Sequence, residues 1–238
     1  MIKFAGIQKT SLMDYPEHIS TILFTQGCNL RCPYCHNPSL ISEDIKDKEN
    51  LINEDEILMF LNERKGKIDG VTITGGEPLM QDIDDLKLFL EKVKTMGLKV
   101  KIDTNGSYPK KLLYLASSGL IDYIAMDFKM PYERYGSLGG KINLDKIKRS
   151  LYNIYQAKEK YDVQYEIRTT VVPGMHESED IREIASQIIN SDWYFIQNFK
   201  GDSTYNKELC GKNGFSEKKL KEFKSIAEEY IDNVRIRN

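Results

Sequence analysis

The 238-residue sequence lacks long apolar runs and any excess of charge of one sign. No hydrophobic stretch approaches the roughly 18 residues that a membrane-spanning helix needs. Its 34 Lys and Arg against 36 Asp and Glu give a net charge of −2, which argues against binding to nucleic acid or to an anionic membrane, because both need a basic face. The N-terminal residues lack the features of a secretion signal. These absences predict a cytoplasmic protein, whose 40% hydrophobic residues are enough for a buried core.

Cysteine is also scarce, with four residues in the chain, and three of them, Cys28, Cys32 and Cys35, lie close together. A disulfide framework would spread its cysteines along the chain, so this grouping predicts a metal or iron–sulfur site. A [4Fe–4S] cluster normally takes four cysteine ligands, and three local thiols would leave one iron open for a substrate. The alternative is a zinc site completed by His36 or Cys210 in a non-catalytic interaction module. Structural zinc usually takes two separated ligand pairs, which disfavours that alternative.

Hydrophobic patterning alternates between short strand-like runs and longer amphipathic segments. This alternation predicts βαβ units with right-handed crossovers around a parallel sheet. Because no repeat or linker-like tract interrupts the pattern, we expect one domain over residues 1–238. Six units could form an open sheet or a partial barrel, and periodicity does not separate the two. The predicted strands cover residues 19–25, 71–74, 98–103, 121–127, 163–172 and 193–198.

Start and stop signals frame the predicted helices. Asn53, with Glu56 three residues later, forms a capping-box pattern before an apolar face. Gly97 provides a C-terminal stop for the next helix, and an amphipathic stripe follows Asn143. Ser178 is expected to cap the helix that begins beside it.

The cysteine spacing, with Tyr34 just before the third cysteine, resembles the signature of the radical S-adenosylmethionine enzymes. The following His36-Asn37 is similar to the activating-enzyme branch of that family, which includes the activators of pyruvate formate-lyase and of anaerobic ribonucleotide reductase. Residues 11–16, Ser-Leu-Met-Asp-Tyr-Pro, resemble the opening of one ribonucleotide reductase activator subgroup. The resemblance implies a partial (β/α)6 TIM-like barrel of parallel strands with outer helices. It also implies a [4Fe–4S] cluster on the three cysteines.

The second predicted strand ends in Gly75-Gly76-Glu77. Paired glycines allow a backbone to approach a ligand closely, and a carboxylate can pair with a cationic amine. By itself the segment could be an ordinary turn. After the three-cysteine motif it resembles the family's GGEP motif, which holds the methionyl amino group of S-adenosylmethionine, with Tyr34 counted among the cofactor-binding residues.

The next strands carry further polar residues at their ends. Asp103 precedes an Asn-Gly turn, and the resemblance places it beside the methionyl group. Asp127 and Lys129 could simply form a salt bridge, but the resemblance directs them to the amino and carboxylate ends of the cofactor. Arg168 would contact the methionyl carboxylate, as its planar fork suits. Gln197 would line the adenine or substrate side.

All these residues fall at or near the C-terminal ends of predicted parallel strands, the end that carries active sites in such folds. The resemblance therefore implies an enzyme that cleaves S-adenosylmethionine to a 5′-deoxyadenosyl radical and forms a glycyl radical on a partner, with anaerobic ribonucleoside-triphosphate reductase favoured. Reduced flavodoxin or ferredoxin would supply the electron. The alternative is a radical enzyme acting on a small molecule such as a 7-deazapurine precursor.

Several residues lie outside this assignment. The loops at 132–140 and 201–214 are polar and contain glycine, so they are expected to contact the partner. His18 and His176 are expected in solvated loops. Cys210 stands among polar residues and is expected to be a free thiol.

Overall fold

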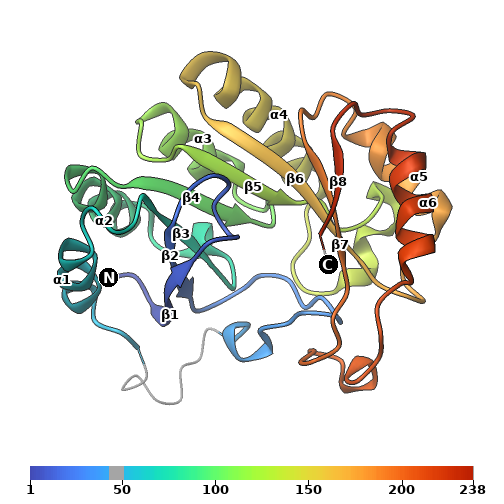
Figure 1. Cartoon of the computed structure of the whole chain (residues 1–238), viewed down its shortest axis with the longest axis horizontal. Helices are drawn as coiled ribbons and strands as arrows, with labels where there is room; N and C mark the ends of the chain where they lie inside the picture. The colour runs from blue at the N-terminus through green and yellow to red at the C-terminus, as the bar shows by residue number, and fades with distance from the viewer. Residues whose placement is uncertain (43–50, 238) are drawn as a thin grey trace.

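The computed structural model describes residues 1–42 and 51–237, and the strands in this part form one eight-stranded sheet in the order β1 to β8 (Figure 1). Only the β1–β2 pair is antiparallel, and every later pair is parallel. The two ends of the sheet are not paired with each other, which makes a partial barrel, as expected. The strands are β1 (Phe4–Ser11), β2 (Ser20–Thr25), β3 (Gly70–Gly75), β4 (Lys99–Thr104), β5 (Tyr123–Asp127), β6 (Gln164–Val171), β7 (Tyr194–Asn198) and β8 (Val234–Arg237).

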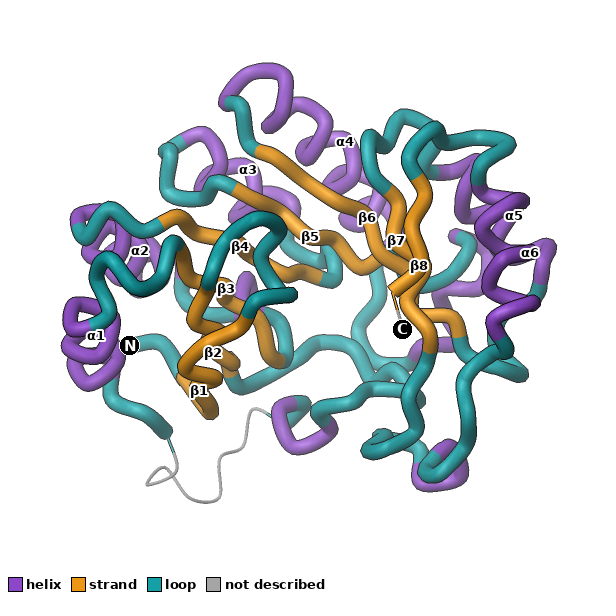
Figure 2. Tube along the Cα trace, in the orientation of Figure 1, coloured by secondary structure: helices purple, strands orange, loops and turns teal. Residues whose placement is uncertain are grey.

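Helices lie on the outer side of the curved sheet (Figure 2). Their buried residues follow the helical period; in α2 these are Leu86, Phe89, Leu90 and Val93. The helices are α1 (Glu54–Glu63), α2 (Ile83–Thr95), α3 (Pro109–Ser117), α4 (Leu144–Tyr161), α5 (Ser178–Gln187) and α6 (Glu217–Ala227). Short 3-10 turns are η1 (Pro38–Leu40), η3 (Pro78–Met80), η4 (Tyr132–Leu138) and η5 (Lys207–Leu209).

The helix caps agree with the sequence in two cases and differ in one. The Asn53 side chain accepts a hydrogen bond from Asp55 N at 2.8 Å, and Asn143 accepts one from Lys146 N at 3.1 Å. Ser178 is not the cap of α5 but its first residue, so that prediction was wrong. The cap is Glu177, whose backbone N–H donates to Asp180 Oδ2 at 2.8 Å. An acidic pair thus replaces the hydroxyl in the capping box.

All six predicted strands are present, with ends within about two residues of the expected ones. The sequence did not predict β1 and β8, which are the two edge strands of the sheet. Polar residues occupy much of both, as in the β1 sequence FAGIQKTS and the β8 sequence VRIR. An edge strand buries less of its surface than a central strand, so its apolar pattern is weak.

Charged side chains occupy the inside of the curved sheet. Lys101 on β4 and Glu166 and Arg168 on β6 are at most 9% exposed. TIM-like barrels usually fill this space with branched apolar residues. Because buried charges are costly unless paired, their pairing pattern determines how the inside of the sheet is organised.

Within residues 1–42 and 51–237, no helix has both the length and the apolar character to cross a bilayer.

Candidate active site

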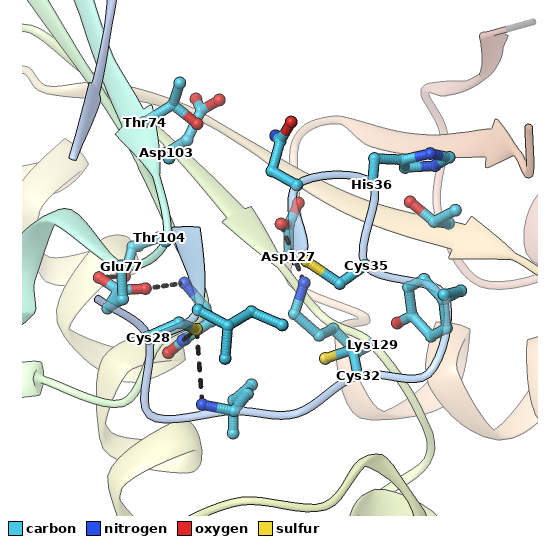
Figure 3. A pocket seen from close by; sticks show the side chains of 18 residues that line it. Cys28, Cys32, Cys35, His36, Thr74, Glu77, Asp103, Thr104, Asp127 and Lys129 are labelled. Atoms are coloured by element: carbon cyan, nitrogen blue, oxygen red, sulfur yellow. Dashed lines mark hydrogen bonds and ion pairs between the residues drawn. The ribbon is translucent and has the colours of Figure 1, made fainter. Parts of the chain in front are cut away.

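A pocket lies at the C-terminal ends of the strands, under the cysteine loop, residues 26–37 (Figure 3). It receives side chains from the β2, β3, β4, β5 and β6 ends of the sheet. Figure 3 shows the three cysteines around it, with Glu77 on the side of Cys28 and Lys129 beside Cys32. The lining residues are Cys28, Leu30, Cys32, Tyr34, Cys35, His36, Asn37, Ile41, Thr74, Gly75, Gly76, Glu77, Asp103, Thr104, Asn105, Asp127, Lys129 and Thr170.

Cys28, Cys32 and Cys35 line this one pocket and form no disulfide. In the described part of the chain, however, no three His, Cys, Asp or Glu side chains are grouped closely enough to hold a single metal ion. Three thiols around one pocket are the kind of ligand that an iron–sulfur cluster takes. Cys210 lies outside the pocket, exposed, with Sγ 3.0 Å from Thr204 Oγ1.

Backbone and side-chain contacts fix the cysteine loop. Arg31 Nη1 donates to the carbonyl oxygens of Cys28 at 2.6 Å and Leu30 at 2.8 Å. Leu30 N–H points to Cys28 Sγ at 3.4 Å, and Cys35 N–H donates to Cys32 O at 3.0 Å. Burial raises the pKa of the Cys28 thiol to about 12. A bound metal centre must therefore displace the thiol proton, as thiolate ligation requires.

The Gly75-Gly76 pair lines the pocket, but its immediate neighbour is the protein's own backbone. A Cβ on Gly76 would lie 2.1 Å from Gly27 O, and one on Gly75 would lie 2.3 Å from Thr25 N. Gly75 also has a φ of 117°, which favours glycine. The close approach, which the sequence suggested would be to a ligand, is therefore between the end of β3 and residues 25–27, where β2 runs into the cysteine loop. The glycines allow the loop to sit directly on the end of the sheet.

Glu77 is fully buried beside this contact. Its Oε1 accepts from Leu79 N at 3.1 Å and from Thr104 Oγ1 at 2.8 Å, and its Oε2 accepts from Asn105 N at 2.7 Å. Burial raises the pKa of the Glu77 carboxyl to about 7, although these three donors oppose the shift. The side chain joins the end of β3 to the loop after β4, and its ionisation is sensitive to pH near neutrality.

The Glu77 pKa predicts a pH dependence of stability in the apoprotein. The folded-state pKa of about 7 exceeds the ordinary 4.5, so stability falls as pH rises from 4.5 to 7 and stays lower above it. The shift corresponds to about 3 kcal/mol. We expect urea unfolding at pH 5 and pH 8 to show this loss, and Glu77→Gln to remove most of it. The change in unfolding free energy between pH 5 and pH 8 is compared in the two proteins, which cancels any uniform cost of the substitution. If that change is as large in the variant as in the wild type, the raised pKa of Glu77 does not cause it.

Asp103, Asp127 and Lys129 line the pocket. Arg168 joins the two carboxylates, and Lys129 pairs with one of them. Arg168 Nε donates to Asp127 Oδ1 at 2.9 Å, and its Nη1 donates to Asp103 Oδ2 at 3.2 Å. Lys129 Nζ donates to Asp127 Oδ2 at 3.1 Å, and Lys101 pairs with Asp103. The Asp127–Lys129 salt bridge, the alternative to a role at the cofactor, is therefore present within a larger buried network of charges.

Arg168 and Gln197 are the two predicted site residues that do not line this pocket in the part of the chain that the structure describes. Arg168 is 9% exposed and also lies 3.8 Å from Glu166 Oε1. Its guanidinium is thus occupied by carboxylates of the protein. Gln197, on β7, pairs in register with Thr170, which does line the pocket. Both remain predictions as ligand-binding residues.

The sequence did not predict Asn105 as a pocket residue, because the Asn105-Gly106 pair was interpreted as part of a turn. Asn105 Nδ2 donates to Asn29 Oδ1 at 3.0 Å and points to Cys28 Sγ at 3.8 Å. Asn29 Nδ2 in turn donates to Ser107 Oγ at 2.8 Å. These bonds join the loop after β4 to the cysteine loop. An Asn-Gly dipeptide is common in turns, so only its position after a strand could have marked it.

The prediction for His176 was wrong. It is 1% exposed rather than solvated. Its Nδ1 accepts from Val172 N–H at 3.1 Å, so the proton is on Nε2, which contacts Lys129 O at 2.9 Å. A buried imidazole that joins two backbone groups orients the segment that carries Lys129. His18 is half-buried, with its ring centroid 4.7 Å from that of Tyr15.

Comparison with known proteins agrees with this geometry. The model of the radical SAM superfamily matches residues 22–188. A Methanocaldococcus jannaschii protein named as a glycyl-radical enzyme activating enzyme is 35% identical over 236 residues, covering 98% of this chain and 95% of the relative. The chain belongs to the radical SAM superfamily, in its branch of glycyl-radical enzyme activating enzymes. A Clostridium pasteurianum pyruvate formate-lyase-activating enzyme is 34% identical over 202 residues, covering 80% of this chain and 77% of the relative.

Solved structures support the same fold at low sequence identity. A radical SAM methyltransferase from Sphaerobacter thermophilus aligns with a TM-score of 0.71 and 13% identity, over 96% of this chain and 68% of that one. QueE from Escherichia coli aligns with a TM-score of 0.56 and 13% identity, over 100% of this chain and 94% of that one. These similarities establish the partial TIM-like barrel as the fold.

As a radical SAM enzyme, the protein uses a [4Fe–4S] cluster and S-adenosylmethionine. The pocket fits both groups. Its three thiols line one space, and thiolates are the usual ligands of such a cluster. The Tyr34 hydroxyl, also at the pocket, is buried and has no hydrogen-bond partner among the described residues. A bound group can satisfy that hydroxyl, which otherwise carries a desolvation cost.

Proposed function

We propose that this enzyme forms a glycyl radical on a partner protein, and that the partner is an anaerobic ribonucleoside-triphosphate reductase. Similarity to an activating enzyme over 98% of the chain supports the reaction. Residues 11–16, which resemble the opening of a ribonucleotide reductase activator subgroup, favour this partner. When bound, the cofactors supply a 5′-deoxyadenosyl radical, which takes a hydrogen atom from a glycine Cα and becomes 5′-deoxyadenosine. One electron per event comes from reduced flavodoxin or ferredoxin.

In this proposal, separate roles fall to the pocket residues and to Arg168 and Gln197, which lie outside the pocket lining. Cys28, Cys32 and Cys35 hold the cluster, and the contacts of Arg31 keep their loop in shape. Glu77 and the acidic groups Asp103 and Asp127 provide negative charge for the methionyl ammonium group, and Lys129 provides positive charge for its carboxylate. Tyr34 and Gln197 contribute to the adenine side. Arg168 positions Asp103 and Asp127, since it contacts both carboxylates.

Two segments that contact the cysteine loop, residues 132–140 and 201–214, are the proposed docking sites for the partner. In the segment 132–140, Gly139 O accepts from Arg31 N–H at 3.2 Å. In the segment 201–214, Asn206 N–H donates to Pro33 O at 2.8 Å. Both segments combine buried residues with exposed ones, such as Tyr205 at 47%. A partner that docks on them could reach the pocket mouth and cover it, which shields a reactive radical from water.

The test is an anaerobic reaction followed by electron paramagnetic resonance. Reconstituted enzyme, S-adenosylmethionine and a reductant are mixed with the reductase of the same cell. We expect a glycyl radical on the reductase and formation of 5′-deoxyadenosine, with both absent when S-adenosylmethionine is omitted. A variant of the reductase whose radical-site Gly is replaced by Ala provides the matched control.

Two other outcomes would overturn parts of the proposal. If a pyruvate formate-lyase acquires the radical and the reductase does not, the reaction stands and the partner is wrong. If no protein radical forms, while a 7-deazapurine precursor stimulates 5′-deoxyadenosine formation, the protein acts on a small molecule.

A further inference from the structure

A second cavity, of about 660 Å³, lies at the end of the barrel opposite the cysteine pocket. It is formed by β8 and by the beginnings of β4 to β7, and it is closed on one side by the connection between β1 and β2. In Figure 1 this dark-blue connection passes in front of β4 and β5, and the lighter-blue cysteine loop lies below them. The lining residues are Met13, Tyr15, Pro16, Glu17, His18, Lys99, Asp122, Tyr123, Gln164, Tyr165, Trp193, Phe195, Arg235, Ile236 and Arg237.

The cavity walls are rich in aromatic rings. Trp193 and Phe195 are stacked, with ring centroids 6.1 Å apart and an interplanar angle of 24°. Tyr15 and Tyr123 meet edge to face at 5.7 Å. A volume of this size falls within the range of about 300–1,000 Å³ that holds small-molecule ligands, and such sites combine apolar walls with a few polar groups.

The positive charges at the cavity differ in whether they are already paired. The guanidinium of Arg237 donates to both oxygens of Glu166, at 2.7 and 2.8 Å. Lys99 and Arg235, by contrast, have no acidic partner among residues 1–42 and 51–237, and Arg235 lies over the Trp193 ring at 4.4 Å. Both are exposed. They leave two cations available beside an aromatic wall.

The negative charges at the cavity offset these cations only in part. Both oxygens of Asp122 accept from Lys94 Nζ at 2.7 Å, and Oδ2 also accepts from Val100 N–H. Glu17 lies at the cavity with no ion pair among the described residues. With two unpaired cations and one unpaired anion, the cavity favours an anionic ligand.

The part of the wall contributed by Met13 and residues 15–18 has features of a binding segment. It overlaps the 11–16 sequence, none of which lines the cofactor pocket. Met13 is 84% exposed, and Tyr15 is buried against the barrel. Glu17 has a φ of 64°, a left-handed conformation that is unusual for a non-glycine residue. Such strain is often found where a segment is shaped for a ligand.

We propose that this cavity binds a planar aromatic anion of nucleotide size. The ring lies against the aromatic wall at Trp193 and Tyr123, which are both half-buried, and the anionic group lies at Arg235 and Lys99. Ring stacking and cation contacts of this kind are individually modest, so the combination of both is what selects the ligand.

The cavity is separate from the cofactor pocket. Buried ion pairs fill the barrel between them, from Glu166, which is fully buried, through Arg168 to Asp103. The two sites share no lining residue. Binding in the second cavity therefore does not compete with S-adenosylmethionine.

Trp193 is the single tryptophan of the chain, so its fluorescence reports directly on the cavity. The probe is ATP, titrated into the full-length protein with and without saturating S-adenosylmethionine, and calorimetry checks each affinity. Adenosine supplies the ring without the anion, and tripolyphosphate supplies the anion without the ring. We expect ATP to quench the fluorescence of Trp193 and to bind at least tenfold more tightly than either fragment. Saturating S-adenosylmethionine should leave the affinity for ATP unchanged.

Arg235→Gln is expected to weaken ATP binding by about tenfold or more, as for the loss of a hydrogen bond to a charged group. Arg149→Gln is the matched control, because Arg149 also lies over an aromatic ring, that of Tyr152 at 5.7 Å, and does not line the cavity. The proposal is overturned if ATP causes no change, if either fragment binds as tightly, if S-adenosylmethionine displaces ATP, or if the two variants behave alike.

Discussion

Replacing Cys28, Cys32 or Cys35 by Ala is expected to abolish 5′-deoxyadenosine formation. The three thiols line one pocket and are proposed as the only protein ligands of the cluster. A cluster that already has one open iron becomes labile when a second loses its thiolate. Iron content per chain after anaerobic reconstitution should fall in each variant. Chromatographic measurement of 5′-deoxyadenosine and colorimetric iron analysis check the two effects separately.

Cys210→Ala provides the matched control for these variants. Cys210 is exposed and lies outside the pocket, so its loss should leave iron content and turnover unchanged. Equal loss of iron from the Cys210 variant would overturn the three-cysteine assignment. Retention of full iron and activity by any of the other three variants would do the same.

Arg168→Ala should destabilise the apoprotein strongly, by about 3 kcal/mol, because removing one partner of a buried charge network leaves the others under-compensated. Asp103, Asp127 and Glu166 all lie within 4 Å of its guanidinium. Burial opposes ionisation of Asp127, but Arg168 and Lys129 hold the pKa of that carboxyl below its usual range. This contribution to stability is present above about pH 4 and is lost as pH falls through the lowered pKa. The difference in stability between the wild type and the variant should therefore shrink as pH falls below about 4.

Urea unfolding, read by circular dichroism, measures this effect, and Arg182→Ala is its control. Arg182 pairs with Glu229 at 2.5 Å on the surface, where ion pairs contribute little, so the control should unfold almost as the wild type does. S-adenosylmethionine binding should also weaken in Arg168→Ala, by about 1.5–3 kcal/mol, whether the side chain contacts the cofactor or positions the carboxylates. Unchanged stability with weakened binding would exclude the positioning role, and unchanged affinity would remove Arg168 from the site.

The sequence was sufficient to predict the central strands and the cofactor chemistry, because both depend on local patterns. β2 to β7 are buried and appear as apolar runs between turn residues. The cysteine motif lies in a single loop, so its spacing indicates a metal or iron–sulfur site, and its resemblance to the family signature supplies the cofactor chemistry. The polar residues after β3, β4 and β5 also follow from topology, since the ends of parallel strands meet at one edge. Topology thus explains why Glu77, Asp103 and Lys129 gather at one edge, while the family resemblance gave them their predicted roles at the cofactor.

What only the tertiary structure decided depends on contacts between distant segments. The edge strands β1 and β8 pair through backbone groups that leave a weak sequence pattern. His176 looked like a loop residue, but it is buried because Val172 N–H and Lys129 O both need a partner there. The Gly75-Gly76 pair proved to contact the chain itself, since the neighbouring backbone is set by the path of the cysteine loop. Arg168 appeared free to bind a carboxylate ligand, yet the register of β4, β5 and β6 had already placed protein carboxylates around it. Local chemistry is thus determined by residue type and spacing, whereas the partner of each buried charge is determined only when the strands are assembled.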